Sequence, residues 1–225
     1  EEIRRQNVLQ SAFVQAVKNE TSYFNSALSL DVNGAVLGMY HKKVLMPFGE
    51  YLPFESYFPS IRSFSPYSGD FNFGDTAQVI PISIAEKTYR AGMLICYEDL
   101  VPSLVRDAAN QGANILINLT NDAWYGITAA PYQHDLIARW RAIESARYLL
   151  RVTNTGYTTV INPLGEIIAD RDIFQKAYIL EKVSMMNYQT IYSRVGDAVS
   201  YLLMIILTFL LFLSSKTKKK SFEDV

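Results

Sequence analysis

The sequence predicts a layered α/β domain followed by a separate apolar helix. Between residues 79 and 169, short apolar runs typical of strands alternate with two longer segments in which apolar residues have helical spacing. Strands that alternate with helices favour sheets covered by helices over a bundle of helices. Further along, an uncharged apolar run from Ala198 to Leu213 predicts the C-terminal helix.

The N-terminal third of the chain predicts a helix, a hairpin and a long loop. Residues 1–19 carry apolar side chains at near-helical spacing. Asn33 and Gly34 lie between two apolar runs, and this dipeptide readily adopts the backbone of a tight hairpin turn. Residues 42–75 are rich in aromatic residues, proline and serine without a regular period, and long irregular connections are usually functional loops.

The middle of the chain supplies the elements of the predicted layers. A helix over 102–110 should end before Gly112, and a second helix is expected over 131–147. A turn at Pro163-Leu164-Gly165 should join the last two strands. Strands are expected over 79–84, 88–95, 114–118, 149–154, 158–162 and 166–169.

The C-terminal apolar run predicts a transmembrane helix over 191–215, with its lead-in. About 20 mostly apolar residues suffice to cross the hydrocarbon core of a bilayer. Four lysines follow at once, at positions 216, 218, 219 and 220. Because basic residues gather on the cytoplasmic side of membrane spans, the tail 216–225 is expected in the cytoplasm and residues 1–190 on the opposite face.

The composition excludes several classes of protein. Of the 225 residues, 49% are apolar and 19% charged, which excludes disorder. The net charge of −1 offers no general attraction for nucleic acid. One cysteine can form neither an internal disulfide nor a structural zinc site by itself, and we expect no metal and no cofactor. The sequence begins Glu1-Glu2-Ile3 without methionine, which predicts a piece of a longer protein.

Cys96 is a candidate nucleophile because it directly follows a predicted strand. The carboxyl ends of strands in α/β folds face the ligand crevice, and the backbone N–H groups that follow can hold a developing oxyanion. A lone cysteine can equally be a small buried apolar residue. Lys42 and Lys43 are candidate cations, since a nearby ammonium stabilises the reactive thiolate. Glu50 follows a turn and can be either a functional carboxylate or a surface residue.

The motifs around these residues resemble the carbon–nitrogen hydrolase (nitrilase) superfamily. They read YHKKVLMPFGEYLPFE, LICYEDLVP and NLTNDAWYG, followed by QHDLIARWRAIESARYLLRVTNTGYTTVINPLGE. More narrowly, the ordered motifs and the C-terminal apolar helix resemble the bacterial apolipoprotein N-acyltransferases over roughly residues 22–213. The resemblance implies a nitrilase-like αββα sandwich, incomplete at its N-terminus, over residues 1–190.

The resemblance also implies roles for individual residues. Cys96 matches the nucleophile that accepts the acyl group, and Lys42 matches the catalytic lysine better than Lys43 does. Glu50 resembles a further essential glutamate that orients the lysine. Tyr97 and Glu98 match supporting residues beside the nucleophile.

Two site residues need separate treatment. Trp124 follows a predicted strand and can line the wall of the site or lie in the core. The family's general-base glutamate belongs to a motif upstream of the residues present, because Glu1, Glu2 and Glu20 stand in no matching context. His41 and His134 are expected to make structural hydrogen bonds rather than to act as acids or bases.

The implied activity is transfer of a fatty acyl chain from a phospholipid, through a cysteine thioester, to the N-terminal amine of a diacylglyceryl-cysteine apolipoprotein. The implied location is the bacterial inner membrane, with the catalytic domain on its periplasmic face. Aromatic residues in the loop 50–73 can contact the acyl chain or pack under the loop. Two alternatives stay open: a membrane-anchored amidase, in which water resolves the thioester, and a non-catalytic module that lacks the general base.

Overall fold

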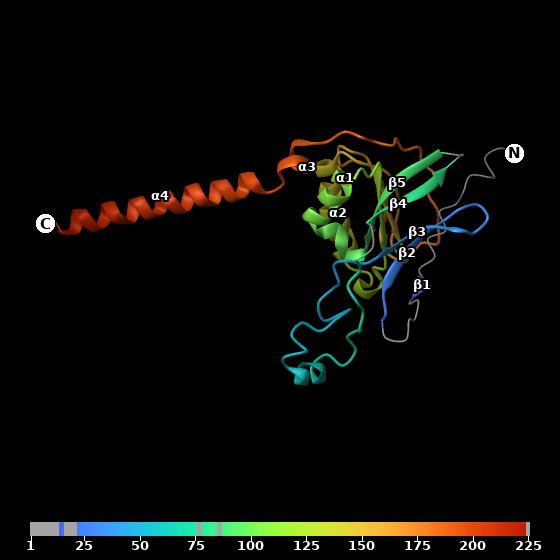
Figure 1. The fold of residues 1–225 in the computed structure, drawn as a ribbon, viewed down its shortest axis with the longest axis horizontal. Helices are drawn as coiled ribbons and strands as arrows, with labels where there is room; N and C mark the ends of the chain where they lie inside the picture. The colour runs from blue at the N-terminus through green and yellow to red at the C-terminus, as the bar shows by residue number, and fades with distance from the viewer. Residues whose placement is uncertain (1–13, 16–21, 76–77, 85–86, 224–225) are drawn as a thin grey trace.

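A computed structural model describes residues 14–15, 22–75, 78–84 and 87–223 of the chain (Figure 1). Its elements form two sheets, two helices packed on the larger sheet, a short helix and a long C-terminal helix. The strands are β1 (Val14–Gln15), β2 (Asn25–Leu30), β3 (Val36–His41), β4 (Val79–Ile84), β5 (Lys87–Ile95), β6 (Ile115–Thr120), β7 (Leu149–Thr153), β8 (Thr158–Ile161) and β9 (Ile167–Arg171). The α-helices are α1 (Pro102–Asn110), α2 (Ala130–Ser145), α3 (Ile191–Val195) and α4 (Ala198–Glu223), and the 3₁₀ turns are η2 (Pro59–Ser63), η3 (Cys96–Leu100) and η4 (Ala123–Tyr125).

The larger sheet has the strand order β4-β5-β6-β7-β8-β9, and the smaller one has the order β1-β2-β3. Strands β5, β6 and β7 are parallel to one another, whereas the outer strands pair antiparallel. The carboxyl ends of the three parallel strands therefore meet at one edge of the sheet. Ligand sites of open α/β sheets form at such an edge.

Two buried cores lie on opposite faces of the larger sheet. Met93 and Ile95 of β5 belong to the core that also includes Ala27 and Tyr40 of the smaller sheet. Leu94, between them, belongs to the core that includes Leu104 of α1. Successive side chains of a strand point to opposite faces, so the alternation along β5 places helices on one face and the second sheet on the other.

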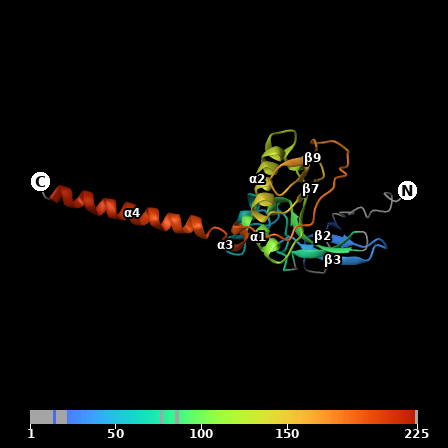
Figure 2. The same cartoon turned by 90° about the horizontal axis from the view of Figure 1, so that it is seen from above.

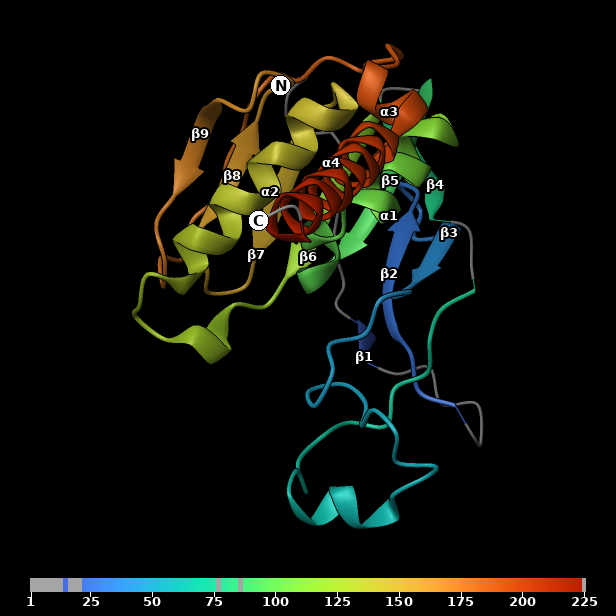
Figure 3. The same ribbon diagram turned by 90° about the vertical axis from the view of Figure 1, so that its left-hand side faces the viewer.

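The arrangement gives three layers, in the order helix, sheet, sheet. Helices α1 and α2 lie on the same face of the larger sheet (Figure 3). The expectation of an αββα sandwich is met for these three layers, whereas the described residues supply no second helical layer. Helix α1 buries Leu104, Val105, Ala108 and Ala109 along one side, which is the periodic pattern of an amphipathic helix.

The smaller sheet approaches β4 closely at Gly38. A Cβ atom at this position would lie 3.0 Å from the Cβ of Ile80 and 3.0 Å from the Cδ of Pro81. Any larger residue would push β3 away from β4. This contact matters for the site, because the segment that carries Lys42 begins where β3 ends.

Most predicted elements are confirmed. The hairpin of β2 and β3 turns at Asn33 and Gly34, and the predicted strands and helices between 79 and 169 are present within a few residues of their expected ends. The loop 42–75 has no strand or α-helix of its own. The helix predicted over 1–19 is wrong at Val14–Gln15, which pair with β2 as a strand, and the remainder of it lies outside the described residues.

The C-terminal helix forms, but it differs from the prediction. Thr190 caps the short helix α3, and Gly196 ends it with a φ of 56°. Helix α4 therefore begins only at Ala198 and leaves the body of the protein (Figures 1 and 2). Within the part of the chain that the structure describes, no helix is both long and apolar enough to cross a membrane. The prediction of a transmembrane helix over 191–215 is not supported.

Leu116 tests the importance of the core between the larger sheet and the helices. It is fully buried in β6. We expect Leu116→Ala to lower the free energy of unfolding by about 2–5 kcal/mol, because the substitution removes apolar contacts and leaves a cavity. Leu164→Ala is the matched control, since Leu164 is 74% exposed. Equal stability losses in urea unfolding of the two variants would contradict this assignment of the core.

Candidate active site

Cys96 lies at the corner between strand β5 and turn η3, at the edge where the parallel strands end. Its φ of 52° is in the left-handed region, which a residue with a side chain adopts only when its surroundings hold it there. The side chain is partly exposed and packs against the core between the two sheets. The sulfur is therefore positioned by the backbone corner rather than buried as an inert apolar group.

Two hydrogen bonds hold this corner. The backbone N–H of Ile95 donates to Oε2 of Glu98 at 2.7 Å. The carbonyl oxygen of Cys96 accepts a hydrogen bond of 3.1 Å from Nδ2 of Asn118, on the neighbouring strand β6. One bond fixes the residue before the sulfur and the other fixes the peptide after it. Together they offset the cost of the left-handed conformation, which is of the order of 1–3 kcal/mol.

The carboxylate of Glu98 also binds the segment that follows β3. Its Oε1 accepts hydrogen bonds from the hydroxyl of Tyr40 at 2.8 Å, from the backbone N–H of Lys43 at 2.7 Å and from that of Val44 at 2.9 Å. Burial raises the pKa of Glu98 above its usual range, although these donors favour the charged form. A single side chain thus attaches the lysine segment to the Cys96 corner.

Lys42 and Glu50 form a buried ion pair. The Nζ of Lys42 lies 2.7 Å from Oε2 of Glu50, and the lysine is only 1% exposed. Asn25 Nδ2 donates to Oε1 of Glu50 at 2.9 Å, and the backbone N–H of Met46 donates to Oε2 at 2.8 Å. Lys43, in contrast, is partly exposed. The ammonium of Lys42 is therefore held in one place by a carboxylate that is itself fixed by two further donors.

Tyr125 of η4 lies close enough to Cys96 to interact with it electrostatically. Burial raises the pKa of Tyr125, and the negative charges of Cys96 and Asp122 raise it further. The neighbouring Trp124 is 86% exposed, which excludes the alternative that it lies in the core. A place for Trp124 in the wall of the site stays a prediction. Tyr97 is half-buried directly after the nucleophile.

Four buried ionisable side chains form a closed ring behind the corner. His134 Nε2 lies 2.6 Å from Oδ1 of Asp99, and its Nδ1 lies 3.2 Å from Oδ1 of Asp122. Arg151 Nε lies 3.3 Å from Oδ2 of Asp99, and Nη2 lies 2.9 Å from Oδ2 of Asp122. Each carboxylate thus binds both cations. We call these four residues the charge ring.

The ring keeps His134 protonated. Burial by itself lowers the pKa of this imidazole, but hydrogen bonds to Asp122 and Asp99 outweigh burial and raise the pKa to about 9. The pKa of Asp122 is lowered: burial alone would raise it, but His134 and Arg151 stabilise the charged form. His134 thus makes the structural hydrogen bonds expected of it.

The structure brings some of the predicted site residues together. Lys42 is paired with Glu50, and Glu98 joins their segment to the corner of Cys96. Direct contact between the Lys42 ammonium and the Cys96 sulfur stays a prediction. The sequence analysis missed residues that lie far away in the chain: Asn25, Asn118, Tyr125 and the charge ring. Polar residues at alternating positions of a strand, such as Asn118 and Thr120 in β6, are a signal that could have indicated them.

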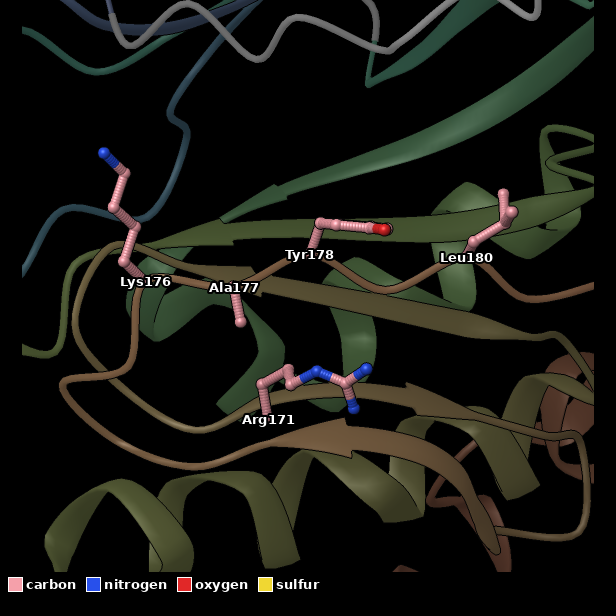
Figure 4. A pocket seen from close by; sticks show the side chains of 5 residues that line it. All are labelled: Arg171, Lys176, Ala177, Tyr178 and Leu180. Atoms are coloured by element: carbon pink, nitrogen blue, oxygen red, sulfur yellow. The ribbon is translucent and has the colours of Figure 1, made fainter. Parts of the chain in front are cut away.

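A surface pocket lies elsewhere, after strand β9. Its lining side chains are Arg171, Lys176, Ala177, Tyr178 and Leu180 (Figure 4). None of them is a residue of the site built around Cys96, so the pocket does not bear on that chemistry.

Comparison with known proteins gives the family and the fold class of the chain. The sequence model of the carbon-nitrogen hydrolases matches residues 4–192. The chain belongs to the carbon-nitrogen hydrolase family. A carbon-nitrogen hydrolase of known structure from Helicobacter pylori covers 71% of this chain, and 56% of its own chain is matched, with a TM-score of 0.52 and 20% identity. That likeness shows the nitrilase-like α/β fold.

Two relatives of the present chain are more similar to it in sequence than the Helicobacter pylori protein is. The apolipoprotein N-acyltransferase of Geobacter metallireducens is 36% identical over 80% of this chain and 34% of its own length. That of Bdellovibrio bacteriovorus is 39% identical over 74% of this chain and 30% of its own length. The chain thus spans about a third of the length of these relatives.

The charge ring makes the stability depend on pH. The pKa of His134 is about 9 in the folded state and about 6.5 in an unfolded chain. Its stabilising contribution is therefore fully present below pH of about 6.5 and is lost as the pH rises through about 9. We expect the free energy of unfolding to fall by on the order of 3 kcal/mol over this range.

Urea unfolding at several pH values measures this effect. His134→Gln should remove the decline between pH of about 6.5 and 9, because the imidazole whose raised pKa causes it is gone. His41→Gln is the matched control, since it removes the other histidine of the chain and should keep the decline. A decline that persists in His134→Gln would contradict the assignment.

Proposed function

We propose that this chain is the catalytic domain of an N-acyltransferase. It moves a fatty acyl chain from a phospholipid, through a thioester on Cys96, to the N-terminal amine of a lipidated apolipoprotein. The observation that carries the proposal is the Cys96 corner, which Glu98 attaches to the segment of the buried Lys42–Glu50 pair. The similarity to apolipoprotein N-acyltransferases supports this acyl acceptor over others.

The reaction has two steps that share one covalent intermediate. The Cys96 thiolate attacks the ester carbonyl of the phospholipid, and the glycerol oxygen leaves with a proton as a lysophospholipid. The amine of the acceptor then attacks the thioester and loses a proton, which restores the thiolate. A group that takes this proton and returns it to the next leaving oxygen closes the cycle. The family resemblance implies a glutamate in that role.

Lys42 has the charge that both steps need. Each attack places negative charge on a carbonyl oxygen, and a fixed cation in a water-poor site stabilises such an oxyanion. The same ammonium favours the thiolate form of a cysteine. Glu50 holds Lys42 in position through the contact of 2.7 Å. Glu98 fixes the corner and Tyr97 and Trp124 contribute to substrate binding beside it.

The substrates are lipids, and exposed apolar groups of the chain suit a lipid surface. The loop 42–75 extends away from the sheets (Figure 1). Its exposed aromatic side chains are Phe48, Phe54, Tyr57, Phe58, Phe64, Tyr67 and Phe73. Helix α4 carries further exposed apolar side chains, among them Leu202 and Phe209. These features support contact with the bacterial inner membrane, and the resemblance adds its periplasmic face as the location.

The amidase alternative makes a different prediction about the acyl acceptor. The full-length protein is incubated with phospholipid and a diacylglyceryl peptide, and the peptide mass is measured. Gain of one acyl chain at the peptide amine supports the transferase. Release of free fatty acid or ready hydrolysis of simple amides, without acylation of the peptide, would favour the amidase, and no turnover of any substrate would favour the non-catalytic module.

Cys96→Ser tests the nucleophile in the full-length protein. The acyl-enzyme should no longer form, because a hydroxyl is far less ionised than a thiol at neutral pH. The measurement is the intact mass of the protein after a short incubation with phospholipid alone. Expression and stability should be unchanged. Accumulation of the acyl adduct on the variant would show that another residue accepts the acyl group.

A pair of neighbouring lysines tests the cation. Lys42→Ala should slow formation of the acyl-enzyme by about 100-fold or more, which is the typical cost of removing one preorganised oxyanion donor. Lys43→Ala is the matched control and should have a small effect, since its side chain is partly exposed. The measurement is the rate of thioester formation in each variant. A larger loss in Lys43→Ala than in Lys42→Ala would overturn the assignment of Lys42.

A further inference from the structure

We propose that the charge ring of Asp99, Asp122, His134 and Arg151 positions the nucleophile corner and keeps the local charge behind Cys96 at zero. The inference rests on the proposed function only in that Cys96 is the nucleophile. It assigns a role to four residues that the two-step reaction itself does not use. They are positioning residues, because they act on Cys96 through other groups.

The ring joins four separate elements at the edge where the parallel strands end. Asp99 comes from η3, His134 from α2 and Arg151 from β7, and Asp122 follows β6. All four side chains are at most 5% exposed. A buried charge is tolerated only when it is paired and hydrogen-bonded, so the positions of these elements are coupled to one another through the ring.

The loop after β7 closes over the ring. Arg151 Nη1 donates to the carbonyl of Tyr157 at 2.8 Å. A Cβ atom at Gly156 would lie 2.5 Å from Oδ2 of Asp122, so this position has no room for a side chain. The ring is thereby shielded by backbone, which strengthens its electrostatic interactions relative to those at a surface.

Asn118 transmits the position of the ring to the nucleophile. Its Nδ2 donates both to Oδ2 of Asp99 and to the carbonyl oxygen of Cys96, the latter at 3.1 Å. Asn118 is fully buried and its Oδ1 has no hydrogen-bond partner among the described residues. The amide is therefore oriented by these two acceptors alone. Movement of Asp99 would shift the peptide that follows the sulfur.

The ring also determines the charge near the sulfur. Two carboxylates, a guanidinium and a protonated imidazole sum to zero. Three other groups face the ring. The aromatic ring of Tyr125 meets that of His134 edge-on at 6.5 Å, and the hydroxyl of Thr120 lies 3.4 Å from Asp122. Asp135, the residue after His134 in α2, interacts electrostatically with Arg151. Burial raises the pKa of Asp135, and its carboxylate accepts a hydrogen bond from Thr159 at 2.6 Å. A ring without its imidazolium would oppose formation of an anion at Cys96.

Charge-changing variants of the ring test this in the full-length protein. The rate of Cys96 alkylation by iodoacetamide at pH of about 7 reports how readily the thiolate forms, and it is read from the mass of the Cys96 peptide. His134→Gln leaves the ring with one negative charge and should slow alkylation by about three- to tenfold. Asp122→Asn leaves one positive charge while the contact with Asp99 keeps His134 protonated, and it should accelerate alkylation.

The double variant separates charge from structure. His134→Gln with Asp122→Asn restores a neutral ring, and alkylation should return to near the rate of the unchanged protein. If the ring served structure alone, the double variant would be at least as slow as His134→Gln, and the proposal would be overturned. Asp107→Asn, an equal change of charge at an exposed position of α1, is the control and should leave the rate unchanged.

Three further outcomes are decisive. If His134→Gln does not fold, Asp122→Asn alone decides, because the proposal requires faster alkylation in that variant. Alkylation needs no acyl donor, so the two proposals fail separately. An alkylation rate that follows the ring charge, with no thioester formed from phospholipid, would refute the acyltransferase proposal and support the ring proposal. Normal thioester formation with alkylation rates independent of ring charge would refute the ring proposal alone.

Discussion

The carboxylate of Glu98 is the interaction on which the site depends. It binds the backbone before Cys96 and two backbone N–H groups of the segment after β3. The nucleophile corner follows β5 of the larger sheet and the lysine segment follows β3 of the smaller sheet. A single buried side chain therefore fixes the relative position of two layers. The hydroxyl of Tyr40 is a fourth donor. A carboxylate is stable in the interior only because such donors replace the water that it loses on folding.

The site also shows how an apolar core accommodates several charges. Odd-numbered positions of β6 pack into the core between the sheets, whereas Asn118 points to the helical side, where the charge ring lies. The sulfur and the lysine pair are on one side of the sheet edge, and the ring is on the other. The backbone of Cys96 connects the two sides. The reacting groups and the ring that supports them thus lie on opposite sides of the sheet edge.

Much of the fold follows from local patterns in the sequence. The Asn33-Gly34 turn, the alternation along β5 and the apolar stripe of α1 each specify an element within a few residues, because they depend on near neighbours in the chain. The helix predicted for residues 1–19 fails at Val14–Gln15, where pairing with β2 overrides the helical pattern. The transmembrane prediction extended the C-terminal helix through Gly196, whose backbone conformation ends α3 before α4 begins.

For the site, the sequence by itself determined which residues carry chemistry: a cysteine at the end of a strand, a lysine and a glutamate beside a turn. It did not determine what surrounds them. Asn25 beside Glu50, Asn118 beside Cys96 and the four members of the charge ring meet only when separate strands and helices pack. The reason is physical: a hydrogen bond or ion pair needs atoms within about 3 Å, and only tertiary structure brings residues far apart in the chain to that distance.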